Sequence, residues 1–473
     1  MSRINTNIPS LQAMHRLVGN QGDLALRLER LSSGLRINRG KDDPAGLIAS
    51  ESLRYEIRGI SQAIDNSSRA INVIATAEGA LNEVSALLLD IRALVTQSAN
   101  EGALSDSEIA ANQLQIDSVL ESIDRIANTT QFNGEKLLNG NLAYQLSGPT
   151  AGNIADYTVY GARIPEGSTL PVVVEVTASA QFGQLKFTGA GTSATNNITL
   201  NVGGVQGSQV LSFAGSAHIS AIAFTINSFT TLTGVSATVS GTGGMYFNSV
   251  GYGSNAFVSV ETLDGTFAVT GGDTATRDAG VDPTVLINGQ VANADGLKIN
   301  SRSNGLDLSL ELTSTFGTAL NNETFGITGG GALFQLGPNV EGAGQVSIGI
   351  PSVTIGTLGN SVAGYLSTLR SGGANELSSQ NYGAAEDIVN LASEQIAVLR
   401  GRLGGFQANQ LETNIRSQQV ALENVKASES AIRDADYAAE IAQLTRAQIL
   451  VQSTTSILGL ANQLPQNVLA LLG

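Results

Sequence analysis

Several residue types are absent or scarce in this chain of 473 residues. Cysteine is absent, which excludes disulfides, thiolate metal sites and cysteine nucleophiles. Tryptophan is also absent and aromatic residues make up only 5%, so the rigid anchors of many binding pockets are few. The two histidines, His15 and His218, have no second ligand at metal-binding spacing. The sequence therefore predicts aliphatic packing, no metal, no cofactor and no catalytic residue, so we do not expect an enzyme.

Positive charge and long apolar runs are also scarce. Asp and Glu number 40 against 25 Lys and Arg, and the net charge of -15 repels nucleic acid and anionic lipid. No window approaches 18 consecutive apolar residues, and residues 1–17 lack the apolar stretch of a cleaved signal peptide. We therefore expect no nucleic acid partner, no membrane insertion and, if the chain leaves the cell, a route without such a signal.

The composition changes twice along the chain. Charged residues are only 14% against 42% hydrophobic, which excludes a chain disordered throughout, and the length predicts more than one domain. Helical spacing dominates up to about residue 142 and again from about 375, whereas 143–374 is rich in Gly, Thr, Ser, Val and Asn. The predicted fold class is α+β and multidomain. A long antiparallel helical coiled-coil or bundle core comes from both chain ends, with a β-rich outward insertion in the middle.

The first zone carries apolar residues three and four apart. A first stripe consists of Leu24, Leu28, Leu31 and Leu35. A second stripe from Leu53 to Val95 predicts one helix about 85 Å long, with Asp43 as its N-cap and Pro44 at its first position. A third helix is expected around Leu114 to Ile126. We divide the zone into a terminal helix at 1–40 and further helices at 41–142.

The middle zone alternates apolar and polar residues every second position, as in strands. The clearest runs are 172–176 and 306–312. Asn288-Gly289 and Asn304-Gly305 are hairpin-turn signals. Residues 216–230 have the spacing of a short helix instead. We expect two small β subdomains at about 177–280 and 281–350 within the insertion.

The last zone returns to the helical period. One stripe of Ile396, Leu399, Leu403 and Phe406 is followed by a shifted one of Leu411, Ile415, Leu422 and Val425. We expect one helix at 375–425 and a terminal helix at 426–473. This terminal helix carries two adjacent apolar seams with a seven-residue repeat, namely Leu444, Val451 and Leu458, and Leu450, Ile457 and Leu464.

A helix apolar over so much of its circumference needs partners on more than one side. The two chain ends must pack together, yet for 1–40 and 426–473 a single molecule offers too little apolar surface to offset the entropy of ordering them. We expect these segments to be frayed in isolated molecules and to become helical between neighbouring subunits. The expected assembly residues are Leu24, Leu28, Leu31, Leu35, Leu444, Leu450, Val451, Ile457, Leu458 and Leu464.

Several motifs in these ends resemble those of bacterial flagellin. The N-terminal ones are INTN at 4–7, LSSGLRIN at 31–38, KDDPAG at 41–46 and TQFNG at 130–134. The C-terminal ones are DADYA at 434–438, RAQIL at 446–450 and ANQLPQNVL at 461–469. The matching ends cover roughly half of the chain.

The resemblance implies an extracellular filament for motility, in which copies of the chain form a homopolymer. The terminal segments 1–40 and 426–473 would form an inner coiled-coil layer around the lumen. The helices at 41–142 and 375–425 would form an outer layer around it, with the β insertion at 143–374 facing outward. The resemblance also implies other partners: an export chaperone for the C-terminal segment, the flagellar type III export apparatus, and the flagellar cap and hook-junction proteins.

One departure from the family pattern concerns the animal Toll-like receptor for flagellin. This chain has Asp90 where recognised flagellins carry Arg, and Gln115 where they carry Glu, while Leu94 matches. Losing an Arg that could form bidentate hydrogen bonds and placing an acid there should weaken docking. The resemblance therefore implies poor receptor activation.

Two alternatives stay open at this point. A hook-filament junction protein shares the helical ends, but the flagellin-like run 462–472 argues against it. A secreted β-domain binding protein on a helical stalk is the other, and the sparse aromatic residues of the insertion disfavour it.

The acidic pairs Asp42-Asp43 and Asp434 with Asp436 are interpreted as helix caps rather than as calcium ligands or an acid and base.

Overall fold

The computed structural model describes residues 6–148, 152–164, 168–187, 197–240, 244–303 and 305–470, with the backbone alone from 464 onward. The chain forms two compact units. The first combines Met1–Arg69, Gln335–Gly344 and Asn409–Gly473. The second combines Ala70–Phe334 with Gln345–Ala408.

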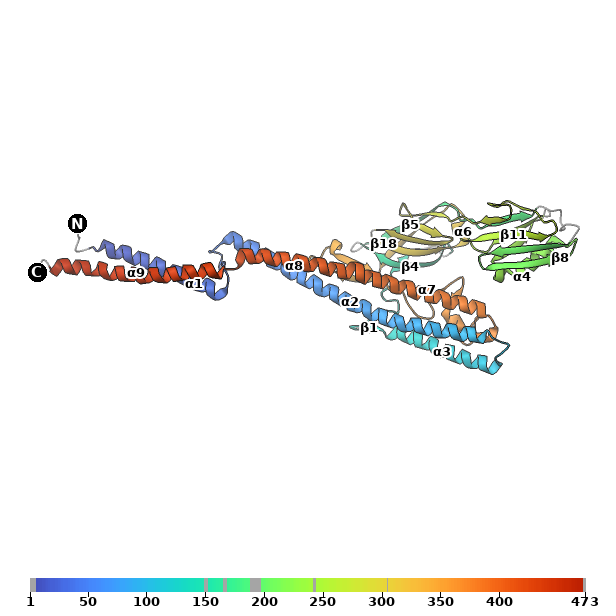
Figure 1. Cartoon of the computed structure of the whole chain (residues 1–473), viewed down its shortest axis with the longest axis horizontal. Helices are drawn as coiled ribbons and strands as arrows, with labels where there is room; N and C mark the ends of the chain where they lie inside the picture. Colours follow the sequence, from blue (N-terminus) through green and yellow to red (C-terminus); the bar gives the residue numbers. More distant parts are fainter. Residues whose placement is uncertain are drawn as a thin grey trace. The chain divides into compact units, whose positions relative to one another are not determined.

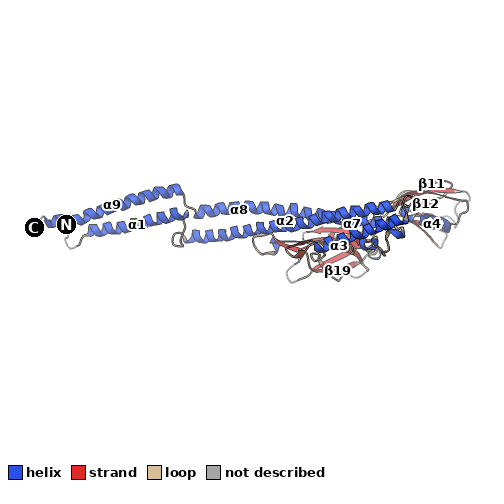
Figure 2. Ribbon diagram, turned by 90° about the horizontal axis from the view of Figure 1, so that it is seen from below, coloured by secondary structure: helices blue, strands red, loops and turns tan. Residues whose placement is uncertain are grey.

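Helices from both chain ends build the first unit. They are α1 (Ile8–Ser33), the first part of α2 (Pro44–Ser98), α8 (Glu412–Arg433) and α9 (Tyr437–Ala470). Helices α1 and α9 lie side by side (Figures 1 and 2). They run in opposite directions, because Asn7 contacts Ala461 whereas Arg27 contacts Glu440. The expected pairing of the two ends is confirmed.

The ends of these helices follow local capping chemistry. The Asn7 side chain accepts from the amide of Ser10 at the start of α1, and α1 ends at Gly34 with φ 74°. Asp43 accepts from the amide of Gly46 at 2.9 Å, directly before Pro44 begins α2. Asp43 therefore caps α2, as predicted.

The other three acidic residues of the two pairs have different roles. Asp436 accepts from the amides of Ala438 and Ala439 and caps α9. Asp42 binds the amides of loop residues Asn38 and Arg39 instead of a helix, and Asp434 stands at the C-terminal end of α8. The expectation of a cap at the start of a helix was therefore wrong for these two, because Asp42 binds a loop and Asp434 is the C-cap of α8.

The long helices of the second unit are the rest of α2, α3 (Asp106–Thr129) and α7 (Tyr382–Phe406). Their buried residues include Ile74, Leu81, Leu88, Ile91, Val95, Ile116, Leu120, Ile123, Ile388, Ile396, Leu399 and Leu403. Leu114, at the start of the range expected for the third helix, is 68% exposed and is not part of its buried face. The spacing of Ile116, Leu120 and Ile123 sets the buried face instead.

A π-helix at Gln407–Leu411 joins α7 to α8. It explains the shift between the two C-terminal apolar stripes, because Phe406 and Leu411 are both buried and stand five residues apart. A π-helix closes its hydrogen bonds over five residues instead of four. Helix α8 extends beyond the expected end at 425 to Arg433, and the break before the last helix lies at 434–436.

A β sandwich, here called the proximal sandwich, has a five-stranded sheet in the order β15-β14-β5-β19-β3 and a four-stranded sheet in the order β16-β17-β18-β4. Its strands are β3 (Gln145–Ser147), β4 (Ile154–Ala162), β5 (Leu170–Ala178), β14 (Thr284–Ile287), β15 (Gln290–Val291), β16 (Asn293–Asp295), β17 (Lys298–Ser303), β18 (Leu306–Leu312) and β19 (Asn322–Gly329). Valines of β5 and leucines of β18 meet in one core, as the alternation predicts.

The distal sandwich has two four-stranded sheets, β12-β6-β10-β9 and β13-β11-β7-β8. Its elements are β6 (Gln184–Phe187), β7 (Ile198–Gly204), β8 (Gly207–Phe213), α4 (Ile219–Ser228), α5 (Thr230–Thr233), β9 (Val235–Val239), β10 (Met245–Ser249), β11 (Phe257–Asp264), β12 (Val269–Thr270) and β13 (Arg277–Ala279). Its core is separate from that of the proximal sandwich. The short helix expected within 216–230 is α4.

The boundaries of the β subdomains differ from the expected ones. The distal sandwich falls within the expected 177–280, but the proximal one does not begin at 281. Strand β5 pairs with β14 and β19, and β4 pairs with β18, so residues from 145 to 178 belong with those after 283. The distal sandwich is thus inserted between two paired strands. The turn at Asn288-Gly289 is confirmed by φ values of 50° and 79°, while Asn304 lies outside the described residues.

Candidate assembly surface

Helix α9 divides its apolar residues between two faces. Leu444, Val451 and Leu458 are half-buried, and Ala447, Thr454 and Ala461, between them along the same face, are buried. Asn20 of α1 donates to Thr454 Oγ1 at 3.4 Å, and Asn7 donates to the carbonyl of Ala461 at 2.8 Å. This face therefore packs on α1.

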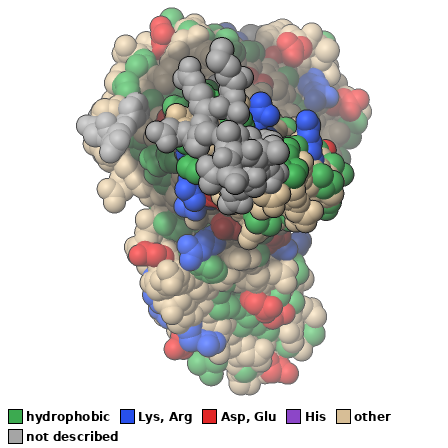
Figure 3. Space-filling view, turned by 90° about the vertical axis from the view of Figure 1, so that its left-hand side faces the viewer, with side chains coloured by type: hydrophobic (Ala, Val, Ile, Leu, Met, Phe, Trp, Pro, Cys, Tyr) green, Lys and Arg blue, Asp and Glu red, His purple; other side chains and the backbone are tan. Residues whose placement is uncertain are grey.

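The second seam of α9 is open to solvent. Leu450 is 39% exposed and Ile457 is 50% exposed. Ile441, Ile449 and Leu460 are exposed as well. Helix α1 has a comparable row, formed by Ile8, Leu11, Met14 and Val18. Hydrophobic side chains also reach the surface between charged ones on the face drawn in Figure 3.

The residues expected to carry assembly thus fall into two groups. Leu24, Leu31 and Leu35 are half-buried like Leu444, Val451 and Leu458, while Leu28 is 49% exposed like Leu450 and Ile457. The side chain of Leu464 lies outside the described residues. Contact of these side chains with neighbouring copies stays a prediction.

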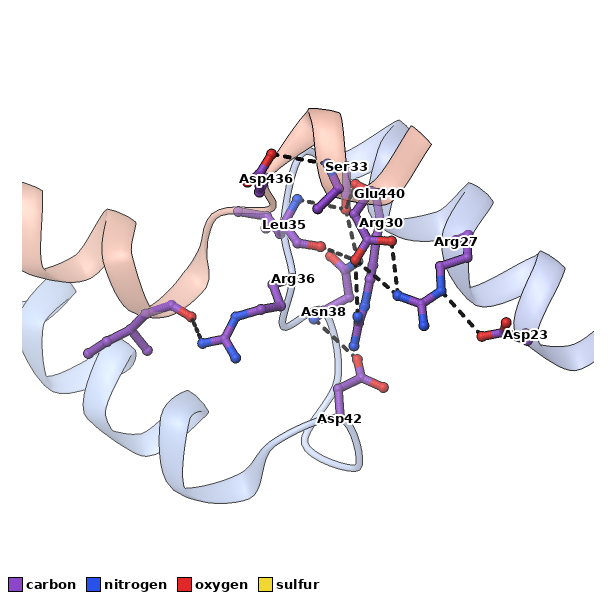
Figure 4. Close-up of polar contacts among 12 residues, drawn as sticks. Asp23, Arg27, Arg30, Ser33, Leu35, Arg36, Asn38, Asp42, Asp436 and Glu440 are labelled. Carbon is purple, nitrogen blue, oxygen red and sulfur yellow. Dashed lines mark hydrogen bonds and ion pairs between the residues drawn. The ribbon is translucent and has the colours of Figure 1, made fainter. Parts of the chain in front are cut away.

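A charged cluster that the sequence analysis missed lies at one end of the α1/α9 pair (Figure 4). Arg27 Nη1 lies 3.1 Å from Glu440 Oε2, and Arg30 Nη1 lies 3.2 Å from Glu440 Oε1. Asp23 Oδ1 accepts from Arg27 Nε at 3.2 Å. Burial alone would lower the pKa of Arg27, but the hydrogen bond and charge of Glu440 raise it. The sequence does carry a signal for this cluster, because Glu440 stands seven residues before Ala447 on the packed face of α9.

Two loops cross beside this cluster (Figure 4). Leu35 and Asp434 form an isolated antiparallel β-bridge. The amide of Arg36 donates to the carbonyl of Arg433 at 2.7 Å, and the guanidinium of Arg36 donates to the carbonyl of Ile432. These bonds hold the segment after α1 against the segment before α9.

The receptor positions lie on α2 and α3 of the second unit. Asp90 and Gln115 are exposed, whereas Leu94 is half-buried. Arg92, two residues after Asp90, forms an ion pair with Glu386 at 3.5 Å. The departing residues are therefore available to a partner.

Across the part of the chain that the structure describes, no helix is long and apolar enough to cross a bilayer. Within those same residues, no three His, Cys, Asp or Glu side chains are grouped so that they could hold a metal ion. Paired terminal helices with an exposed apolar row, together with two separately packed β sandwiches, define the fold as that of an α+β protein with helical ends.

Comparison with known proteins gives the family. The bacterial flagellin N-terminal helical region matches residues 4–143, and the bacterial flagellin C-terminal helical region matches 387–472. Flagellin B of Helicobacter pylori is 30% identical over 533 residues, with 99% of each chain covered. Flagellin of Salmonella muenchen is 30% identical over 522 residues, with the same coverage. The chain belongs to the bacterial flagellin family.

Among solved structures, the flagellar cap protein FliD of Escherichia coli is 20% identical, with a TM-score of 0.28, and the similarity covers 46% of this chain and 64% of that one. Because this TM-score is low, the family assignment rests on the sequence matches alone. The two flagellin sequences match this chain over its full length, so the protein is a structural subunit of the bacterial flagellar filament, in a family of structural proteins. The same match favours this function over that of a β-domain binding protein on a helical stalk. The family implies an extracellular filament.

Proposed function

We propose that copies of this chain polymerise by covering the open apolar rows of α1 and α9 with the same helices of neighbouring subunits. The observation that supports this is the division of α9, which packs one seam on α1 and leaves Leu450 and Ile457 exposed. Each Leu or Ile that a neighbour buries contributes about 1.5–3 kcal/mol. Ordering costs about 1–2 kcal/mol per residue, so the terminal helices become fully ordered only when neighbours cover them.

The ten seam residues would act in two ways. The half-buried ones hold α1 and α9 together, and the exposed ones face neighbouring subunits. The inner layer then consists of 1–40 and 426–473 and the outer layer of 41–142 and 375–425. Residues 143–374 face outward. The separate cores of the two sandwiches support this arrangement, because neither needs a neighbour to bury its apolar side chains.

The remaining partners follow from family membership. The chain would leave the cell through the flagellar type III export apparatus. An export chaperone would cover the C-terminal segment, whose exposed Ile449, Leu450 and Ile457 are a liability in an unassembled subunit. The flagellar cap and hook-junction proteins would contact the growing and the basal end of the filament.

The test replaces exposed seam residues of α9. Leu450→Asp with Ile457→Asp should abolish filaments in a sedimentation assay, because two carboxylates would have to be buried between subunits. Near-native β-sandwich signals in the NMR spectrum would show that the second unit still folds. Phe224→Asp is the matched control, since Phe224 is 77% exposed on α4 of the distal sandwich. Normal filaments from the double variant would refute the proposal.

Electron microscopy of a deletion strain separates the junction alternative. Loss of a filament subunit leaves hooks without filaments, whereas loss of a junction protein releases subunits into the medium.

A further inference from the structure

Glu440 is a buried carboxylate on an otherwise uncharged helix face. It is only 7% exposed, and it stands on the α9 face that packs on α1, seven residues before Ala447. Thr454 and Ala461 continue that seven-residue repeat. The face is therefore a heptad seam in which Glu440 is the only charged member among these four positions.

The facing row of α1 has the same character. Its buried or half-buried members are Ala13, Leu17, Asn20, Leu24, Arg27 and Leu31, spaced alternately four and three apart. Most are small or apolar, and Arg27 is the charged one. Arg30, one turn further along α1, lies beside Glu440 as well. Both helices thus place their charge at the same level of the seam.

Apolar seams of this kind specify pairing but not register. Shifting α9 by one heptad exchanges Leu444, Val451 and Leu458, which are alike, so these apolar contacts change little. The bonds of Asn20 to Thr454 and of Asn7 to Ala461 would be lost. The same shift removes Glu440 from its arginines. In one direction it moves the carboxylate toward Asp23, a like charge. A buried carboxylate without its cationic partners is strongly unfavourable.

We propose that Glu440, together with Arg27 and Arg30, sets the register of α1 against α9. This inference rests on the proposed function, because the register decides which residues of the open apolar rows on one subunit face those on its neighbours. The charged cluster is a positioning device rather than a main source of stability. Buried ion pairs often contribute little net stability, and a polar group in an apolar helix seam is a well-attested register determinant.

The absence of cysteine allows a direct register assay by disulfide trapping. Asn20→Cys with Thr454→Cys reports the register of the structure, in which these side chains are hydrogen-bonded. Asn20→Cys with Ala447→Cys, or with Ala461→Cys, reports a shift by one heptad in either direction. Each pair is oxidised mildly in the full chain, in both the filament pellet and the supernatant. Intrachain bonds are then separated from interchain ones on non-reducing gels.

With the native charges, the 20–454 bond should exceed either shifted bond by about tenfold or more. The triple variant Arg27→Leu, Arg30→Leu, Glu440→Leu should give all three bonds in comparable amounts. The exchanged variant Arg27→Glu, Arg30→Glu, Glu440→Arg should restore the preference. Arg39→Leu is the control, because it breaks an exposed ion pair with Glu29 and should leave the preference unchanged.

An unchanged 20–454 preference in the triple variant would overturn the register proposal, as would equal trapping of the three pairs with native charges. The proposed function is tested separately. It fails if Leu450→Asp with Ile457→Asp still forms filaments, whatever the disulfide pattern, and it survives if that variant stays soluble while the register assay fails.

Discussion

The backbones of Leu35 and Asp434 pair as an antiparallel β-bridge, although one follows the first helix and the other precedes the last. The amide of Ala435 extends the contact by donating to the carbonyl of Gly34 at 2.9 Å. Both helical ends of the chain are thus interrupted at the same level. Because each break carries its own cap, the α1/α9 pair is a distinct packing segment, and these backbone bonds restrain its register together with its own side chains.

The left-handed conformation of Gly34 gives a first prediction. Gly34→Ala should lower the stability of the terminal helices by about 1 kcal/mol, because φ is 74° there and a Cβ disfavours that conformation. Gly22→Ala should instead raise it by about 0.5–1 kcal/mol, because Gly22 lies within α1 with no atom near its Cβ position. The thermal midpoint of filament melting measures both. Equal effects of the same sign would contradict the assigned helix end.

Asp156 gives a prediction about pH. Burial raises its pKa, and the charge of nearby Glu311 adds to the effect. An acid whose pKa is raised by folding disfavours the folded state once the pH exceeds the unfolded value of about 4. Asp156→Asn should therefore be more stable than the native chain at pH 7.5, and the difference should vanish toward pH 3. Calorimetric unfolding of the isolated subunit measures this.

Asp42 provides a control of opposite sign. Hydrogen bonds from the amides of Arg39 and Asn38 lower its pKa, so its contribution is present at neutral pH and is lost as the pH falls. Asp42→Asn should be less stable than the native chain at pH 7.5, again with no difference at low pH. A parallel response of both variants would show that the assigned environments are wrong.

Exchanging the residues at the receptor positions on α2 and α3 gives a further prediction. The native monomer should activate the flagellin receptor weakly, because the resemblance aligns exposed Asp90 and Gln115 with the Arg and Glu of recognised flagellins. Asp90→Arg with Gln115→Glu should raise the response in a reporter assay. Adding Leu94→Ala should lower it again. Strong signalling by the native monomer would refute the inferred evasion.

Local sequence signals predicted elements better than their long-range pairing. Alternating residues identified β5 and β18, and Asn288-Gly289 identified a hairpin, because such signals are local. The pairing of β5 with β14 could not be found in this way. It joins residues on either side of the whole distal sandwich, and nothing near Ala178 or Thr284 encodes that partner.

The candidate site shows a similar limit. The apolar seams were visible as heptads, since Leu and Val recur at fixed spacing. Glu440 was overlooked because the burial of a single carboxylate depends on which residues face it across the helix pair. Arg27 and Arg30 supply that partner from the other end of the chain. The five-residue step from Phe406 to Leu411 was visible as a shift, but only the backbone shows it to be a π turn.

Amide hydrogen exchange of α1 and α9, compared between isolated subunits and filaments, tests the central claim most directly. The account predicts rapid exchange along both helices in subunits and strong protection in filaments, while strands such as β5 and β18 stay protected in both. Full protection of α1 and α9 in subunits that show no tendency to polymerise would contradict it.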